Sequence, residues 1–158
     1  MVNPTDFDGI LTREIICRVS SAGVLWFVAV VGLVFDVVHI KRAKCVERKN
    51  CGIIILAIIL IIGLPIFAYS RVLPIVNDIS HQTVVRATGF YQVGAIEKEF
   101  KTAYISAQIG NEKINLEIPM GKQKCFPRED CLGTFWYAKD SLILLMFVSE
   151  DGIIYTAE

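Results

Sequence analysis

The five cysteines are the side chains of this sequence best suited to redox chemistry. Cys125 and Cys131 flank a five-residue segment, a spacing that can close a small loop through a disulfide. Cys45 and Cys51 have the same spacing around basic residues, and Cys17 stands alone. We expect Cys125 and Cys131 on the non-cytoplasmic side of a membrane, in an oxidising compartment, so we predict a disulfide between them. The second pair is expected to keep free thiols, with S-palmitoylation as an alternative in a eukaryotic cell.

Other residue combinations that could do chemistry are sparse. Asp36 and His39 would share one helix face, either as a pair at the membrane surface, which we favour, or as a proton relay. Glu129 and Asp130 could bind a cation, but calcium sites need more oxygen ligands close in sequence, so we favour a solvated loop. The sequence has no Gly-rich phosphate loop, no HExxH motif and no G-x-S-x-G motif. We therefore predict no enzyme activity, no metal site and no cofactor.

Two apolar runs lie near the N-terminus. The first carries no charged residue from Val19 to Phe35, and the second carries none from Asn50 to Ser70. About 20 mostly apolar residues span a hydrocarbon core of about 30 Å, and a single helix satisfies its own backbone groups there. We therefore predict transmembrane helices at residues 19–40 and 50–70. A cleaved signal peptide is not favoured, because acidic residues precede the first run and no small-x-small cleavage site follows it.

The segment 41–49 between the two helices is basic. Short basic loops stay in the cytoplasm, so the N-terminal tail 1–18 and the region 71–158 are both expected on the non-cytoplasmic side. We therefore expect a two-pass protein of the bacterial inner membrane with both termini in the periplasm. The basic residues that determine this topology are Lys41, Arg42, Lys44, Arg48 and Lys49.

One proline lies inside the second predicted helix, and another follows it. Pro65 lies inside the predicted helix, where proline removes a backbone donor and kinks the chain. It could form a hinge or a binding notch between the helices, although proline is common in membrane helices and we favour ordinary tolerance. Pro74 is predicted to end any continuation of the helix beyond the apolar run.

From residue 71 onward the apolar residues follow a period of two. Thr102–Ile109 and Lys113–Ile118 alternate on either side of a Gly-Asn-Glu turn, which is typical of a β-hairpin. Gly89 is a possible bulge or bend in the strand that contains it. Five or six short strands predict a small antiparallel β-barrel or sandwich, OB-like or SH3-like by first choice. The other predicted strands are residues 83–93, 134–138, 142–148 and 153–156.

Aromatic residues surround the loop between Cys125 and Cys131. Aromatics in strands usually fill a core or pack at the membrane interface, and we favour that interpretation for these residues. Trp136 and Tyr104 could instead form a contact patch, because Trp and Tyr are enriched in binding hot spots. The candidate partner-binding residues are Tyr104, Trp136, Glu129 and Asp130.

The charge of the C-terminal region limits its partners. Residues 72–158 carry eight basic and eleven acidic side chains, a net charge of −3, with no basic stripe for nucleic acid. We predict a membrane-anchored, non-catalytic binding protein whose exported β-domain engages a protein partner. It would be an accessory subunit of an envelope complex or an immunity or exclusion factor. The alternative is a helix-mediated homo-oligomer acting as a scaffold or transport component, for which Gly23, Gly32 and Gly63 allow some close helix approach.

Overall fold

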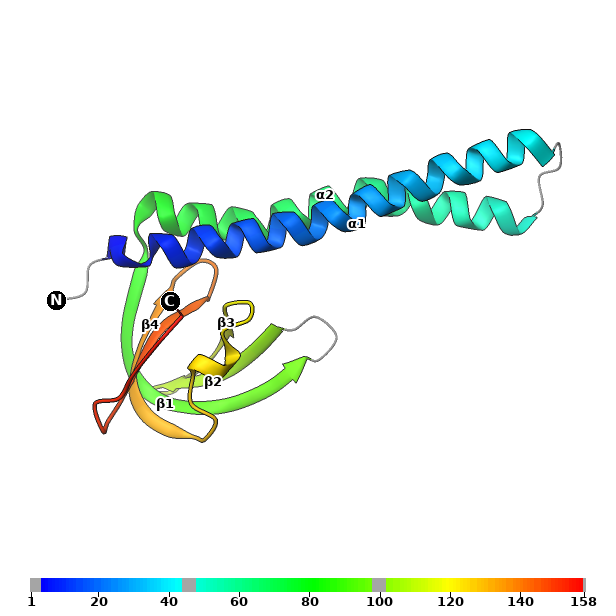
Figure 1. Ribbon diagram of the computed structural model, residues 1–158. Helices are drawn as coiled ribbons and strands as arrows, with labels where there is room; N and C mark the ends of the chain where they lie inside the picture. Colours follow the sequence, from blue (N-terminus) through cyan, green and yellow to red (C-terminus); the bar gives the residue numbers. More distant parts are fainter. Residues whose placement is uncertain (1–3, 44–47, 98–101, 158) are drawn as a thin grey trace. The chain divides into compact units, whose positions relative to one another are not determined.

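The structure, a computed structural model, describes residues 4–43, 48–97 and 102–157 (Figure 1). The chain divides into two compact units, and each is described by itself. We call Ile16–Leu73 the helical unit. The second unit, the β-domain, combines Met1–Ile15 with Pro74–Glu158. The helical elements are η1 (Pro4–Phe7), α1 (Asp8–Ala43) and α2 (Arg48–His81).

Two long apolar helices form the helical unit. Each is long and apolar enough to cross a membrane, and the rest of the chain buries none of its most apolar 18-residue stretch. Large apolar side chains therefore point outward from both helices, among them Phe27, Phe35 and Ile66. This exposure distinguishes α1 and α2 from the core helices of a soluble protein. The structure confirms two long apolar helices, and the predicted segments 19–40 and 50–70 lie within α1 and α2, which both extend further. That these helices cross a membrane stays a prediction.

The sequence predicted that the second helix ends at Pro74. This prediction is wrong, because α2 continues to His81. Ile75 and Asp78 of the added turns are fully buried in the β-domain. Their packing outweighs the roughly 3 kcal/mol that a proline costs inside a helix. The helix stops in a Schellman motif, in which Gln82 has a φ of 51° and the N–H of Thr83 donates to the carbonyl of Asp78 at 3.1 Å.

The N-terminal segment is an integral part of the β-domain. The prediction treated residues 1–18 only as a tail, whereas the described part of this region is helical from Pro4 onward. Glu14 is also buried, and its Oε2 atom accepts a hydrogen bond from the backbone N–H of Met120 at 3.0 Å. The segment therefore joins the β-domain by both apolar and polar contacts. Its buried apolar side chains are Phe7, Ile10 and Leu11.

The strands form one antiparallel sheet in the order β3-β2-β1-β4-β5-β6. This confirms the predicted antiparallel β architecture, but the sheet is not closed into a barrel, and β3 and β6 are its edges. A hydrogen bond from the N–H of Glu117 to the carbonyl of Leu142, at 2.8 Å, links β3 to the segment before β5. The strands are β1 (Val84–Glu97), β2 (Thr102–Ile109), β3 (Glu112–Ile118), β4 (Cys131–Ala138), β5 (Leu144–Ser149) and β6 (Ile154–Thr156).

β1 curves strongly as it runs along the sheet (Figure 1), and two glycines meet where it pairs with β4. Gly89 of β1 is paired with Gly133 of β4. A Cβ atom at Gly89 would collide with the carbonyl oxygen of Gln108, and one at Gly133 would collide with the carbonyl oxygen of Val148. Neighbouring backbones thus approach Gly89 too closely for a side chain, whereas the register irregularity of β1 lies further on, between Val93 and Ile96.

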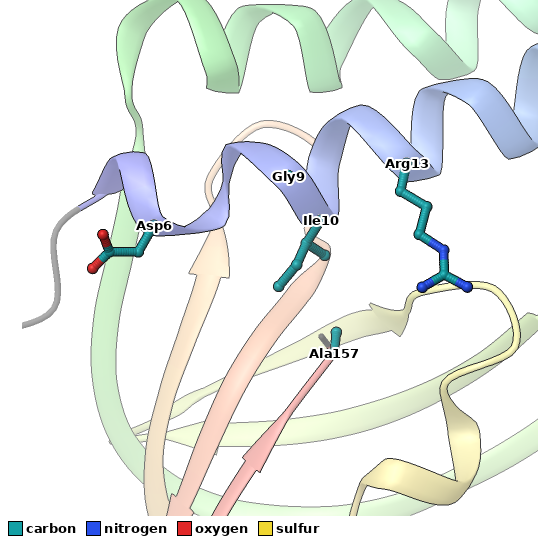
Figure 2. A pocket seen from close by; sticks show the side chains of 5 residues that line it. All are labelled: Asp6, Gly9, Ile10, Arg13 and Ala157. Atoms are coloured by element: carbon teal, nitrogen blue, oxygen red, sulfur yellow. The ribbon is translucent and has the colours of Figure 1, made fainter.

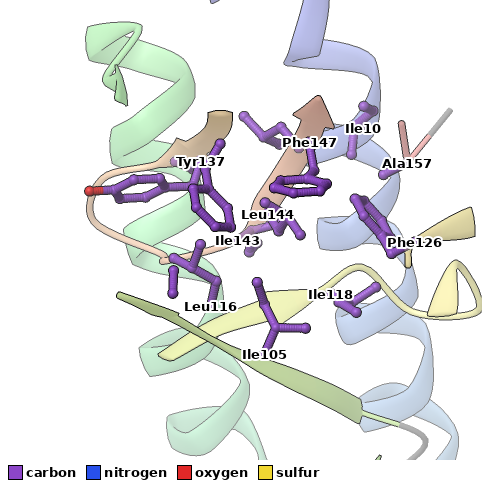
Figure 3. Packing of buried hydrophobic residues seen from close by; sticks show 14 of the residues in the cluster. Ile10, Ile105, Leu116, Ile118, Phe126, Tyr137, Ile143, Leu144, Phe147 and Ala157 are labelled. Carbon is purple, nitrogen blue, oxygen red and sulfur yellow. The ribbon is translucent and has the colours of Figure 1, made fainter. Parts of the chain in front are cut away.

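One face of the sheet, the inner face, carries the core of the β-domain (Figure 3). Tyr91, Phe135 and Phe147 are fully buried on it, and the Phe147 ring lies 5.0 Å from each of the other two ring centroids. Ile10 of α1 reaches the same cluster beside Phe147, as Figure 3 shows. The apolar face predicted for β2 is buried here, which confirms the alternation found in the sequence. Its fully buried members are Ala103, Ile105 and Ala107.

A buried carboxylate ties the end of α2 to the sheet. Asp78 is 1% exposed. Its side chain accepts hydrogen bonds from the hydroxyl of Thr83 at 2.6 Å and from the backbone N–H groups of Asp140 and Ser141 at 2.9 and 2.8 Å. These bonds satisfy the charge and fix the turn between β4 and β5.

Candidate partner-binding surface

The face of the sheet opposite the core has no covering element within the described parts of the β-domain. We call it the outer sheet face. It spans β1, β4, β5 and β6, because side chains alternate along each strand and those facing inward belong to the core. Its residues are Arg86, Thr88, Phe90, Leu132, Thr134, Trp136, Met146, Val148, Ile154 and Thr156.

Strand register arranges these side chains in rows across the sheet. One row runs from Arg86 through Trp136 and Met146 to Thr156, and the next ends at Ile154. Arg86 lies over the ring of Trp136, with its guanidinium carbon 5.2 Å from the ring centroid. This cation–π contact holds an aromatic ring and a positive charge together on the surface.

The outer sheet face is apolar to an extent that requires explanation. Leu132 is 46% exposed and Ile154 is 65% exposed, although both lie within strands. Trp136 and Met146 are half-buried and also touch core residues, so only part of each side chain is available to a partner. Exposed apolar groups that cluster on one face of a small domain often mark an interaction site.

The structure does not bring the two predicted aromatic contact residues together. Trp136 is paired with Arg86 near the start of β1, whereas Tyr104 lies opposite the register irregularity between Val93 and Ile96. Arg86 and Val93 are seven residues apart, about 23 Å of strand at about 3.3 Å per residue. Trp136 therefore belongs to the outer sheet face, and Tyr104 lies on β2 beside the far end of β1.

Both residues of the predicted acidic pair are exposed, but only Asp130 has a structural hydrogen bond among those described. Oδ1 of Asp130 accepts a hydrogen bond from the backbone N–H of Val93 at 2.9 Å. The hydroxyl of Tyr91 donates to the carbonyl of Pro127 at 3.1 Å, so the loop before β4 is held against β1 at two points. Glu129 is exposed. Asp130 is thus occupied in positioning this loop.

The predicted disulfide between Cys125 and Cys131 is not formed in the structure, where both residues are free thiols. Cys125 is exposed at the end of the short helix η2 (Gln123–Cys125), whereas Cys131 is half-buried opposite Tyr91. The two side chains therefore lie in different environments. Burial raises the pKa of the Cys131 thiol, and the negative charges of Asp130 and Asp151 raise it further.

The predicted topology determinants lie at the ends of the helices that they were expected to orient. Lys41 and Arg42 belong to the last turn of α1, and Arg48 and Lys49 begin α2. Lys44 lies outside the described residues. The expected cytoplasmic position of this segment stays a prediction.

A small hollow lies between the first turns of α1 and the end of the chain (Figure 2). Its volume is about 160 Å³, and Asp6 and Arg13 stand at its two ends with Ile10 between them. This volume is below the roughly 300 Å³ at which typical ligand pockets begin. Among residues 4–43, 48–97 and 102–157 no three His, Cys, Asp or Glu side chains are grouped closely enough to hold a metal ion.

Sequence reasoning missed most of the outer sheet face. Leu132 precedes the strand predicted at residues 134–138, whereas β4 begins at Cys131. Extending the alternation backward through the glycine at position 133 would have placed Leu132 on the same face as Trp136. Ile154 lies within a predicted strand, but its face depends on the pairing of β6 with β5, which no local pattern reveals.

Comparison of the chain with protein-family models, curated proteins and solved structures gives no match. The apolar helices and the outer sheet face are therefore the features from which a function is inferred.

Proposed function

We propose that this protein is anchored in a membrane by α1 and α2 and binds a protein partner through the outer sheet face, without catalysing a reaction. The observation that carries the proposal is the cluster of apolar side chains on a sheet face that no other described element of the β-domain covers, with Leu132 and Ile154 the most exposed. An accessory subunit of an envelope complex and an immunity or exclusion factor would both use such a surface.

The apolar exterior of the helical unit supports the membrane anchor. Phe27, Phe35 and Ile66 point away from the chain together with most of the large apolar side chains of both helices. In water each would carry an unfavourable hydration free energy, at about 25 cal/mol per Å² of apolar surface. In a bilayer the same side chains contact lipid, and the helices satisfy their backbone groups internally.

The composition of the β-domain supports a topology with both termini on one side. Met1–Ile15 and Pro74–Glu158 fold into a single compact unit. This arrangement fits two helices that each cross the bilayer once, with the basic segment 41–49 retained in the cytoplasm. We extend the proposal to the bacterial inner membrane, with the β-domain in the periplasm.

The chemistry of the outer sheet face favours a protein partner. Protein interfaces are enriched in aromatic residues, Met and Arg, and this face offers Trp136, Met146 and Arg86 in one row. Nucleic acid would require a basic surface, whereas residues 72–158 carry a net charge of −3.

Site-specific photocrosslinking in intact cells tests the proposal. A benzophenone amino acid at Leu132 or Ile154 should form a covalent adduct with a second protein, identified by mass spectrometry. The matched control carries the same amino acid at Asn111, which is exposed in the turn between β2 and β3 and lies outside the outer sheet face. Adducts with the same protein from all three positions, or adducts with this chain alone, would contradict the proposal.

A charge substitution separates partner binding from folding. Ile154→Glu should abolish the adduct formed from position 132. Burying a carboxylate in the interface with the partner would require its desolvation, which is unfavourable. The thermal unfolding midpoint of the purified chain should stay unchanged, since Ile154 is mostly exposed. Retention of the adduct would argue against this face.

A further inference from the structure

Pro65 removes a hydrogen bond from the middle of α2. In a helix the N–H of each residue donates to the carbonyl four residues earlier, and proline has no N–H. The carbonyl of Ile61 therefore lacks its helical partner. In a bilayer no water replaces that partner, and an unsatisfied carbonyl costs several kcal/mol.

Trp26 of α1 supplies the missing donor. Its indole N–H donates to the carbonyl oxygen of Ile61 with an Nε1–O distance of 3.0 Å. We infer that Trp26 is a latch: it satisfies the carbonyl that Pro65 leaves free, fixes the register of α1 against α2, and releases α2 to bend at Pro65 when this bond opens. The inference concerns the helical unit alone and does not depend on a partner.

A second cross-helix bond agrees with the same register. Arg18 lies eight residues before Trp26 on α1, and its Nη1 atom donates to the carbonyl of Arg71, ten residues after Ile61, at 3.3 Å. In two antiparallel helices with a fixed register, a step toward the N-terminus of one helix corresponds to a similar step toward the C-terminus of the other. Trp26 and Arg18 thus hold α2 at two levels of the helical unit.

Open space beside the latch gives α2 room to bend. A hollow of about 200 Å³ adjoins Trp26 and Pro65, and small side chains such as those of Ala22 and Ala68 line it. A Cβ atom added at Gly23, in the same wall, would meet nothing within 4 Å. The hydrogen bond from Trp26 to Ile61 is the specific contact to which we assign the holding of this segment of α2.

A double-mutant cycle tests the latch on the full chain in phosphatidylcholine liposomes. Trp26→Phe removes the donor and keeps an aromatic ring, and Pro65→Ala restores a backbone N–H that can pair with Ile61. The measurement is amide hydrogen exchange in the α2 peptide around Pro65. Interhelical hydrogen bonds in membranes are worth about 0.6 to 1.7 kcal/mol. At a factor of ten per about 1.4 kcal/mol, Trp26→Phe should speed exchange by about 3- to 16-fold.

The same substitution should have little effect once the carbonyl has a backbone partner. In the Pro65→Ala chain, Trp26→Phe is expected to change exchange by less than about 2-fold, because the N–H of residue 65 then pairs with Ile61. Phe27→Leu is the matched control, since Phe27 is the next aromatic of α1 and points outward. It should change exchange in neither background. Equal effects of Trp26→Phe in both backgrounds would overturn the latch.

An isosteric analogue separates the N–H group from the shape of the ring. Benzothienylalanine at position 26, in a Trp136→Phe chain, replaces the indole N–H by sulfur and keeps the bicyclic shape. It should speed exchange around Pro65 as Trp26→Phe does. Exchange equal to that of the Trp26-containing parent would show that ring volume, and not the donor, holds α2, and would overturn the inference.

Discussion

Gly89 of β1 and Gly133 of β4 are paired directly across the sheet, and neither position has room for a side chain. Backbone atoms of β2 crowd the first glycine and those of β5 crowd the second. Glycine at both positions therefore lets the backbones of neighbouring strands approach closely at this level of the sheet.

Gly133→Ala should destabilise the β-domain by about 1 to 3 kcal/mol. The new methyl group would meet the carbonyl of Val148 and the ring of Phe147, and overpacking of this kind typically has that cost. Denaturant unfolding of the full chain in detergent, followed by near-ultraviolet circular dichroism, measures the change. Gly9→Ala is the control, because a Cβ there meets nothing within 4 Å. Equal stability of the two variants would show that the sheet can relax at position 133.

Replacing Asp78 should unfold the junction between α2 and the sheet. Asp78→Ala leaves the Asp140 and Ser141 N–H groups without their acceptor, and hydrogen bonds to charged groups contribute about 1.5 to 3 kcal/mol each. We expect a loss of at least about 3 kcal/mol in the free energy of unfolding. Asp151→Ala, in an exposed turn, should stay within about 0.5 kcal/mol of the parent. A similarly small loss for Asp78→Ala would contradict the assigned role.

Leu11→Ala tests whether the N-terminal segment is part of the β-domain. Leu11 is 1% exposed, and leucine-to-alanine changes in a core cost about 2 to 5 kcal/mol. Ile16→Ala is a control of similar size, five residues further along α1, where the side chain is exposed. Near-ultraviolet circular dichroism of the β-domain aromatics during unfolding should report a large loss for Leu11→Ala and little change for Ile16→Ala. The reverse order would remove the segment from the core.

The stability of the β-domain should fall at alkaline pH in a way that depends on Tyr91. Burial, followed by the negative charges of Cys131 and Asp130, raises the pKa of Tyr91 well above its ordinary value of 10.0. The unfolded chain therefore loses this proton first, so the stabilisation is complete below about pH 10 and declines as the pH rises further. Burial raises the pKa of Tyr137 in the same direction.

Tyr91→Phe removes that titration together with the hydrogen bond to Pro127. The variant should lose about 1 kcal/mol at neutral pH, the usual contribution of one hydrogen bond, and should lose stability less steeply than the parent above pH 10. Unfolding free energies at several pH values between 7 and 11 provide the comparison. Parallel curves for the two proteins would contradict a raised pKa at Tyr91.

Local patterns predicted those elements whose environment is set by their own residues. The hairpin of β2 and β3 was found almost to the residue, because Ala103, Ile105 and Ala107 alternate with polar side chains and the turn is marked by Gly110. The helices α1 and α2 followed from long uncharged runs.

Features set by distant contacts were not predicted. The continuation of α2 past Pro74 depends on the burial of Ile75 by a sheet formed later in the chain. The sequence shows the helical spacing of Phe7, Ile10 and Leu11. No local pattern indicates that these side chains pack into the core of the β-domain. Likewise, Pro65 reveals a free carbonyl, but not which side chain of α1 reaches it.

The β-domain draws its core from both ends of the chain, because Met1–Ile15 and Pro74–Glu158 form one unit. In the proposed two-pass arrangement the first helical turns leave the ribosome long before the last strand is made. The side chains that these turns bury in the folded domain then stay exposed until the later strands have crossed the membrane. They are Phe7, Ile10 and Leu11. Folding of this domain is consequently completed only after β6 has been made, and a soluble version would need residues 4–15 joined to residues 74–157.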